Sequence, residues 1–223
     1  MKIGIMGGTF DPIHNGHLML GQAAYEKFNL DQIWFMPNGN PPHKEQDSIG
    51  SDIETRIRMV ELAIAPHPEF VLELYESDPS KVSCSYQTLE HFQTQYPEDE
   101  LYFIVGADSL FAIETWVKPE RIFPTCTFLA AYRDEIDTAE EMQAQIAHLK
   151  KKYHARIEIL PTPLMDVSSH ELRQRIKEQE SIRSYVPSDV ADYIEEHCLY
   201  QDAGETIEKG TIEMPEQRRD IKS

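Results

Sequence analysis

Residues 2–17 read KIGIMGGTFDPIHNGH, and this stretch decides the fold. Its first part, Lys2 to Met6, is a short apolar run with the character of a buried strand. The run meets Gly7 and Gly8 at once, and a helix reaching roughly to Phe28 follows the loop. A strand, a glycine-containing loop and a helix in direct succession predict an alternating α/β architecture.

The loop between this strand and helix has the features of an anion-binding site. Because glycines lack a Cβ atom, backbone N–H groups at Gly7 and Gly8 can approach phosphate oxygens closely, and the following helix adds its positive dipole end. His14 and His17 lie three residues apart at the helix entrance, which places both imidazoles on one side. Imidazoles can donate hydrogen bonds or carry positive charge while charge shifts between phosphates.

The same loop leaves other interpretations open. A Gly-Gly pair after a strand is often only a turn, and a His-x-x-His pair can be a metal site or two unrelated surface residues. The loop is neither a Walker A motif, because no Gly-Lys-Ser/Thr closes it, nor Gly-x-Gly-x-x-Gly. A kinase or a dehydrogenase is therefore disfavoured.

Apolar runs of strand length recur along the chain, with helical patterns between them. The further runs are Gln32 to Met36, Phe70 to Leu74, Leu101 to Val105, Thr127 to Tyr132 and Ile157 to Leu160. The pattern predicts an α/β fold with a doubly wound parallel sheet covered by helices on both faces, in a single domain over residues 1–200. Ligands bind beyond the carboxyl ends of such strands, in the loops near Gly7, Pro37, Gly106 and Pro161.

Two capping-box pairs predict helix starts near these loops. Ser51 and Glu54 precede one helical face, and Ser168 and Glu171 open a helix late in the chain. The second helix would present its N-terminal N–H groups, with Ser169 beside them, to an anion.

Composition limits the partners. With a formal net charge of -18, the chain repels nucleic acid and anionic membranes, so we expect neither as a partner. Three widely spaced cysteines, with no Cys-x-x-Cys pair, fit a reducing cytoplasm and predict no zinc site. Residues 201–223 are polar without a sustained period, which is typical of a flexible tail.

The first loop resembles the signature of the nucleotidyltransferase superfamily, whose fold is Rossmann-like. The superfamily's His-x-Gly-His core is matched by residues 14–17. The resemblance implies that His14 and His17 contact a triphosphate and that His17 stabilises the transition state.

Other segments are similar to bacterial nicotinate mononucleotide adenylyltransferases. Asn40 to Lys44 matches their Asn-Pro-Pro-His-Lys loop, and Gly106 to Ser109 matches the Gly-x-Asp segment that holds the adenylate ribose. Trp116 falls where the family stacks a Trp on the pyridine ring, although a lone Trp is ordinarily a core residue. Residues 167–173 resemble the superfamily's Ile-Ser-Ser-Thr-x-Ile-Arg, with His170 in place of Thr.

The resemblance implies a complete set of site residues. The expected catalytic residues are His14, His17, Lys44 and Arg173. ATP is expected to bind Gly7, Gly8, Thr9, Phe10, His14, His17, Gly106, Asp108, Ser168, Ser169 and Arg173. The pyridine nucleotide is expected to bind Lys44, Ser85, Trp116, Val117 and Arg133. Cys84 and Ser85 depart from the family's Tyr and Thr, which bears on recognition of the pyridine carboxylate.

The implied activity is adenylyl transfer from ATP to nicotinate mononucleotide, on the route to NAD. Mg²⁺ would be carried with ATP, since no carboxylate cluster has the spacing of a protein cage. The chain could form a homo-oligomer. The alternatives are a phosphopantetheine adenylyltransferase, which has similar first-loop and Ser-Ser motifs, and a non-catalytic adenine-nucleotide sensor on the same fold.

Overall fold

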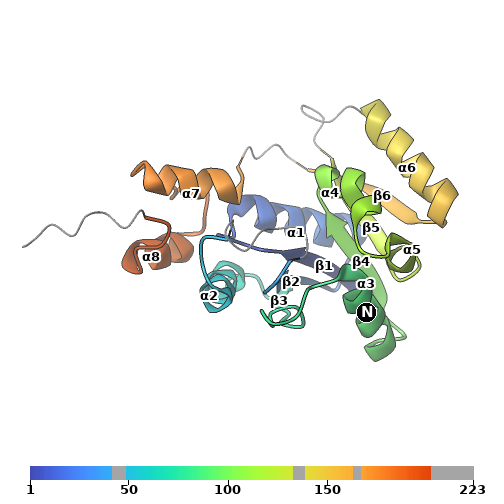
Figure 1. The fold of residues 1–223 in the computed structure, drawn as a ribbon, viewed down its shortest axis with the longest axis horizontal. Helices are drawn as coiled ribbons and strands as arrows, with labels where there is room; N and C mark the ends of the chain where they lie inside the picture. Colours follow the sequence, from blue (N-terminus) through green and yellow to red (C-terminus); the bar gives the residue numbers. More distant parts are fainter. Residues whose placement is uncertain (42–48, 133–138, 163–166, 202–223) are drawn as a thin grey trace, which may run out of the picture.

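A six-stranded parallel sheet forms the centre of the computed structural model, which describes residues 1–41, 49–132, 139–162 and 167–201 (Figure 1). The strands are ordered β3-β2-β1-β4-β5-β6. They are β1 (Lys2–Gly8), β2 (Gln32–Pro37), β3 (Phe70–Leu72), β4 (Glu100–Val105), β5 (Thr127–Tyr132) and β6 (Arg156–Pro161). This order confirms the Rossmann-like, doubly wound prediction.

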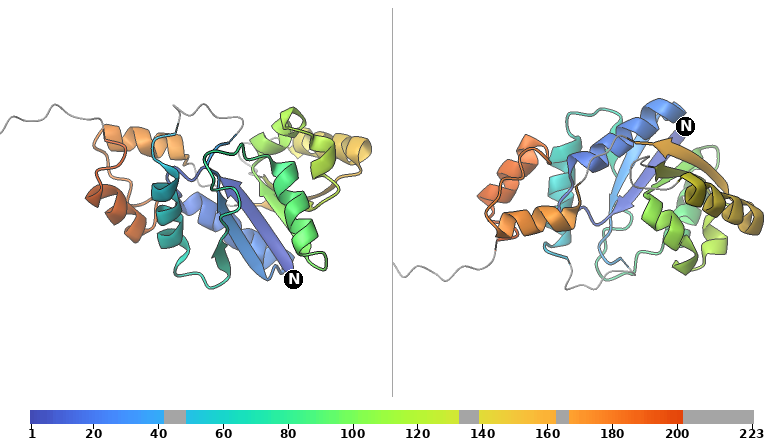
Figure 2. Two further views of the ribbon diagram at one scale, coloured as in Figure 1. Left: turned by 60° about the horizontal axis from the view of Figure 1, so that its bottom comes forward. Right: turned by 90° about the horizontal axis from the view of Figure 1, so that it is seen from above.

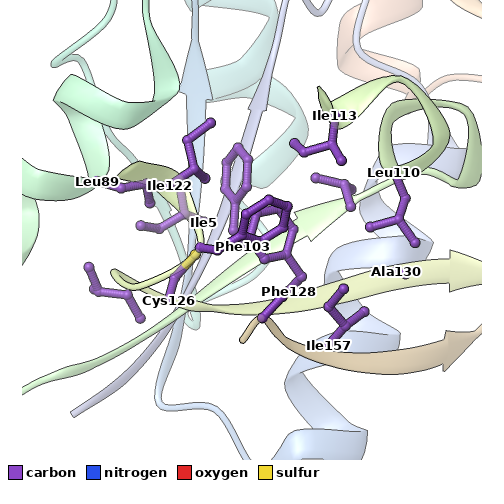
Figure 3. Packing of buried hydrophobic residues seen from close by; sticks show 14 of the residues in the cluster. Ile5, Leu89, Phe103, Leu110, Ile113, Ile122, Cys126, Phe128, Ala130 and Ile157 are labelled. Carbon is purple, nitrogen blue, oxygen red and sulfur yellow. The ribbon is translucent and has the colours of Figure 1, made fainter. Parts of the chain in front are cut away.

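Each central strand is buried on both faces, as its near-continuous apolar sequence predicts. Successive residues of β1 alternate between two hydrophobic clusters, with Ile3 and Ile5 in one and Met6 in the other. The first cluster includes Phe103 of β4 and Phe128 of β5, whose rings meet edge to face with centroids 5.7 Å apart (Figure 3). Burying a side chain of this size stabilises the fold by about 2 kcal/mol.

Helices cover both faces of the sheet (Figure 2). One face carries α3 (Ser85–Gln95), α4 (Ala107–Ala112), the 3-10 helix η2 (Ile113–Thr115), α5 (Pro119–Ile122) and α6 (Ala139–Tyr153). The other carries α1 (Asn15–Phe28), α2 (Ile53–Ile64) and the C-terminal helices α7 (Ser169–Lys177) and α8 (Ser188–Glu196). Because α8 packs against α2, the end of the described chain returns to the first loops.

The winding direction reverses between β1 and β4, which are parallel neighbours in the sheet although β2 and β3 lie between them in sequence. Connections on the two sides of this point run in opposite directions, so the loops after β1 and β4 diverge and leave a crevice at the carboxyl ends. The first loop and the loop at Gly106 flank that crevice.

The start of α2 differs from the sequence prediction. The cap is Asp52, whose carboxylate accepts from the N–H of Thr55 at 2.7 Å, so the predicted pair of Ser51 and Glu54 is wrong. Ser51 instead donates to Asp11 at 2.6 Å. Because its hydroxyl makes this tertiary hydrogen bond, the next residue, Asp52, caps the helix. At α7 the predicted box is confirmed, since Ser168 and Glu171 exchange hydrogen bonds.

Within the described ranges, no helix is both long enough and apolar enough to cross a membrane. Most of the predicted tail, from residue 202 onward, lies outside them.

Candidate active site

Two histidines stack at the entrance of α1. The ring centroids of His14 and His17 are 3.7 Å apart, as the three-residue spacing predicts. The N–H of His14 donates to Nδ1 of His17 at 3.2 Å. Because Nδ1 accepts, the neutral His17 ring carries its proton on Nε2, where it can be donated.

Phe10 supports His17 from the first loop. Phe10 is buried and adopts the left-handed backbone conformation, with φ of 50°. Its ring meets the His17 ring edge to face, with centroids 5.0 Å apart. The loop thereby orients His17 by packing as well as by hydrogen bonding.

His14 lies deeper than its partner. Its side chain is buried, and Nδ1 makes no hydrogen bond to the described part of the chain. Burial lowers the pKa of His14 to about 4, against an opposing effect of the nearby Glu171 carboxylate. At neutral pH, His14 is therefore a neutral hydrogen-bonding group and adds no positive charge to the site.

Gly16 makes room for the His14 ring. A Cβ atom at Gly16 would lie 3.0 Å from Nδ1 of His14 and 3.1 Å from its Cε1. Any larger residue here would have to displace the imidazole, so the glycine between the two histidines fixes where the His14 ring can sit.

Two pockets open at the carboxyl ends of the strands, and His17 lines both. The first pocket, of about 350 Å³, lies between the first loop and the loops around α3 and α5. The second pocket, of about 200 Å³, lies between the start of α1 and the start of α4. The imidazole of His17 thus stands at the boundary between two ligand-sized spaces.

Most of the expected site residues line one of these pockets. Around the first are Gly7, Gly8, Thr9, Phe10, Ser85, Trp116, Val117 and Ser169. Around the second are His14, Gly106 and Asp108. The residues expected to bind the pyridine nucleotide and those expected to hold the adenylate ribose are therefore separated, with His17 between them.

Four expected residues do not fall into this arrangement. Lys44 and Arg133 lie outside the described residues. Ser168 and Arg173 line neither pocket. Arg173 instead reaches the first loop, where Nη1 donates to the backbone oxygen of Asp11 at 2.7 Å and lies 3.5 Å from its carboxylate.

Trp116 combines the two roles that its sequence context left open. It packs against the hydrophobic cluster that includes Phe103, with ring centroids 6.3 Å apart, and it also lines the first pocket. The ring is therefore fixed from behind while its accessible surface contributes to the pocket wall.

Glu76 is a pocket residue that sequence reasoning missed. Its carboxylate accepts from Oγ1 of Thr88 at 2.5 Å and from Nδ2 of Asn38 at 3.4 Å. Burial raises the pKa of Glu76, which favours its neutral form. Glu76 therefore adds a buried, hydrogen-bonded carboxyl group to the wall of the first pocket.

The sequence pattern did not predict the structural roles of Arg56 and Asp11. Nη1 of the buried Arg56 donates to the backbone oxygens of Thr9 and Asn38, at 2.7 and 2.8 Å. It thereby joins the loops after β1 and β2. Asp11 is also buried and accepts hydrogen bonds from Gly50, just before α2, and from Tyr200, near the end of the described chain.

The start of α7 is fastened to the first loop, because Oγ of Ser169 donates to the backbone oxygen of Pro12 at 2.9 Å. Helix N-termini of α1 and α7 are therefore brought to one site, where both can face an anion. Among the described residues, His, Cys, Asp and Glu side chains do not gather in groups of three or more that could hold a metal ion.

Residues 5–175 match the cytidylyltransferase-like family, so the chain is a nucleotidyltransferase, and its sheet order agrees with that class. A probable nicotinate-nucleotide adenylyltransferase of Lachnoclostridium phytofermentans is 42% identical over 199 residues, covering 89% of this chain and 98% of that protein. One of Clostridium kluyveri is 39% identical over 203 residues, covering 90% and 100%. The chain belongs to the nicotinate-nucleotide adenylyltransferase family.

Solved structures show the same fold. The Plasmodium falciparum nicotinic acid mononucleotide adenylyltransferase complexed with NaAD has a TM-score of 0.73 at 21% identity, covering 89% of this chain and 97% of that one. The same enzyme complexed with APC has a TM-score of 0.72, with coverage of 89% and 96%.

Proposed function

We propose that this chain transfers the adenylyl group of ATP to nicotinate mononucleotide, giving nicotinic acid adenine dinucleotide and pyrophosphate. The observation that carries the proposal is the position of His17, whose ring lines both pockets. A reaction that joins two nucleotides needs their phosphates to meet, and the boundary between the pockets is where they would do so. A relative of this fold is described as complexed with NaAD, the expected product.

The second pocket suits the adenosine of ATP. Asp108 offers a carboxylate that can accept hydrogen bonds from both hydroxyls of a ribose. A Cβ atom at Gly106 would have nothing within 4 Å, so the backbone of this residue is open to a ligand. The triphosphate would then extend from this pocket past His14 and His17.

The first pocket suits the nicotinate ring. Trp116 provides an aromatic surface for stacking, and α3 begins at Ser85 on the same pocket wall. The cap residue of α3, Cys84, makes no side-chain capping hydrogen bond, so its helix dipole is not neutralised by a carboxylate cap. A carboxylate on the pyridine ring is favoured at this positive helix end.

The chemistry requires positioning more than activation. A phosphate oxygen of nicotinate mononucleotide is already anionic at neutral pH; it attacks the α-phosphorus, a P–O bond forms, and the bond to pyrophosphate breaks. His17 donates from Nε2 to the phosphate oxygens as charge accumulates, and neutral His14 can donate without adding a charge. Lys44 and Arg173 would supply the fixed positive charge.

Mg²⁺ is proposed to arrive with ATP and to neutralise part of the triphosphate charge.

A pyrophosphate-release assay with ATP and a panel of acceptors tests the proposal. We expect rapid release with nicotinate mononucleotide, slower release with nicotinamide mononucleotide, and none above background with phosphopantetheine. Fast turnover of phosphopantetheine would assign the other adenylyltransferase activity. ATP binding without release from any acceptor would instead favour the non-catalytic sensor.

A further inference from the structure

The end of the described chain contacts the first loop through one hydroxyl. Oη of Tyr200 donates to Oδ1 of Asp11 at 2.8 Å, across 189 residues of sequence. Tyr200 follows α8, which packs against α2 (Figure 1). Its hydroxyl also lies 3.1 Å from Oγ of Ser51.

Asp11 is a buried carboxylate, with only 2% of its surface exposed, and a buried charge is costly unless donors surround it. Ser51 donates to Oδ1 at 2.6 Å, and the N–H of Gly50 donates to Oδ2 at 2.6 Å. With Tyr200, three short hydrogen bonds satisfy the carboxylate.

Arg173 shares this carboxylate at longer range. Its Nη1 is 3.5 Å from Oδ2 of Asp11, longer than each of the three hydrogen bonds. Arg173 is the cation expected to reach the triphosphate, yet its guanidinium lies on the first loop here. A triphosphate that binds this guanidinium competes with Asp11 for it.

Packing joins the same groups. A Cβ atom at Gly50 would lie 2.9 Å from Cδ of Arg173 and 2.9 Å from Cδ1 of Tyr200. The stem of Arg173 and the ring of Tyr200 therefore both lie close against this glycine.

We propose that Tyr200 is a positioning residue for ATP binding: its hydroxyl satisfies the Asp11 carboxylate, so that Arg173 can leave Asp11 for the triphosphate. The inference rests on the proposed function in taking ATP as the anion that Arg173 meets. Tyr200 itself touches neither pocket. It acts through Asp11.

Removing the hydroxyl tests this role. In Tyr200→Phe, Asp11 loses one donor and holds Arg173 more tightly, so ATP must compete for the guanidinium. We expect the dissociation constant of α,β-methylene-ATP to rise roughly tenfold, the size of one hydrogen bond to a charged group. The KM for nicotinate mononucleotide should stay within about twofold, because the first pocket is untouched.

Calorimetric titration with α,β-methylene-ATP is the measurement, with Tyr193→Phe as the matched control. Tyr193 lies in α8, and its ring packs against that of His197 with centroids 4.1 Å apart. Ser51→Ala removes the other hydroxyl from Oδ1, so it should weaken ATP binding in the same direction even if Tyr200→Phe folds poorly. Unchanged binding in both test variants, or equal weakening in the control, overturns the role.

A double-mutant cycle with Asp11→Asn separates this coupling from a loss of packing. Asp11→Asn removes the carboxylate charge, while the hydrogen bond from Arg173 to the backbone oxygen of residue 11 stays in place, so adding Tyr200→Phe should change the dissociation constant by less than about twofold. Additive effects would refute action through Asp11. If the wild type binds the analogue but adenylylates no nicotinate mononucleotide, the proposed function fails while this inference stands. If it does not bind the analogue, both fail.

Discussion

The imidazoles of His14 and His17 stack with their centroids 3.7 Å apart, yet they differ in environment. His17 lines both pockets, whereas His14 lines only the second and is buried. One pair of rings thus provides one group at the boundary where phosphates would meet and one neutral group behind it.

Replacing His17 with Ala should lower kcat by about two to four orders of magnitude with little effect on folding, because a transition-state donor is lost. Steady-state kinetics and thermal unfolding would measure both. His67→Ala is the control, since its ring stacks on Phe70 and lines neither pocket. Near-normal turnover of His17→Ala would remove His17 from the mechanism.

The pKa of His14 makes stability depend on pH. Burial lowers it from 6.5 to about 4, so the folded state binds fewer protons than the unfolded state between these values. Stability from this group is complete above pH 6.5 and is lost as pH falls toward 4, by about 3 kcal/mol.

Chemical denaturation of the wild type and of His14→Gln across this range measures the difference. Glutamine stays neutral, so on acidification the unfolding free energy of the variant should fall by about 3 kcal/mol less than that of the wild type. The other titratable groups contribute equally to both proteins. If the unfolding free energies of the two proteins changed with pH in parallel, a lowered pKa of His14 would be contradicted.

Gly16→Ala should lower kcat by about tenfold without destabilising the protein. The new Cβ presses on the His14 ring, and small displacements of a catalytic group are costly, whereas Ala favours a helix over Gly. Gly21→Ala, in the same helix, is the contrasting variant because its Cβ would meet the rings of Phe35 and Phe70. That change should reduce stability rather than kcat.

Trp116→Ala should raise the KM for nicotinate mononucleotide by about tenfold while the KM for ATP changes little, because stacking in the first pocket is lost. Trp116→Phe should recover part of the loss. If thermal stability fell and neither KM changed, Trp116 would be a core residue only.

The sequence predicted the sheet because each apolar run is short, bounded and buried on both faces, as Ile3, Ile5 and Met6 illustrate. It also predicted that the two histidines lie on one side of the helix entrance, although His14 is the extended N-cap residue and its N–H also bonds to the His17 ring. The network around Asp11 was not predictable, because its bond to Tyr200 joins residues 189 positions apart.

Burial and competition between partners explain the other differences. Local pattern favoured Ser51 as a helix cap, but its hydroxyl is used by Asp11 and the cap is Asp52. The neutral state of His14 follows from its burial in the folded protein, which the spacing of residues in the sequence does not predict. Glu76 looks like an ordinary surface carboxylate in sequence until Thr88 and Asn38 are placed beside it.

The placement of His17 at the boundary of the two pockets is tested most directly by following its imidazole ¹⁵N signals during separate titrations with α,β-methylene-ATP and nicotinate mononucleotide. The structure predicts that the His17 signals shift with each ligand alone. A ring that responds to only one of them, or to neither, would contradict the proposed meeting point of the two phosphates.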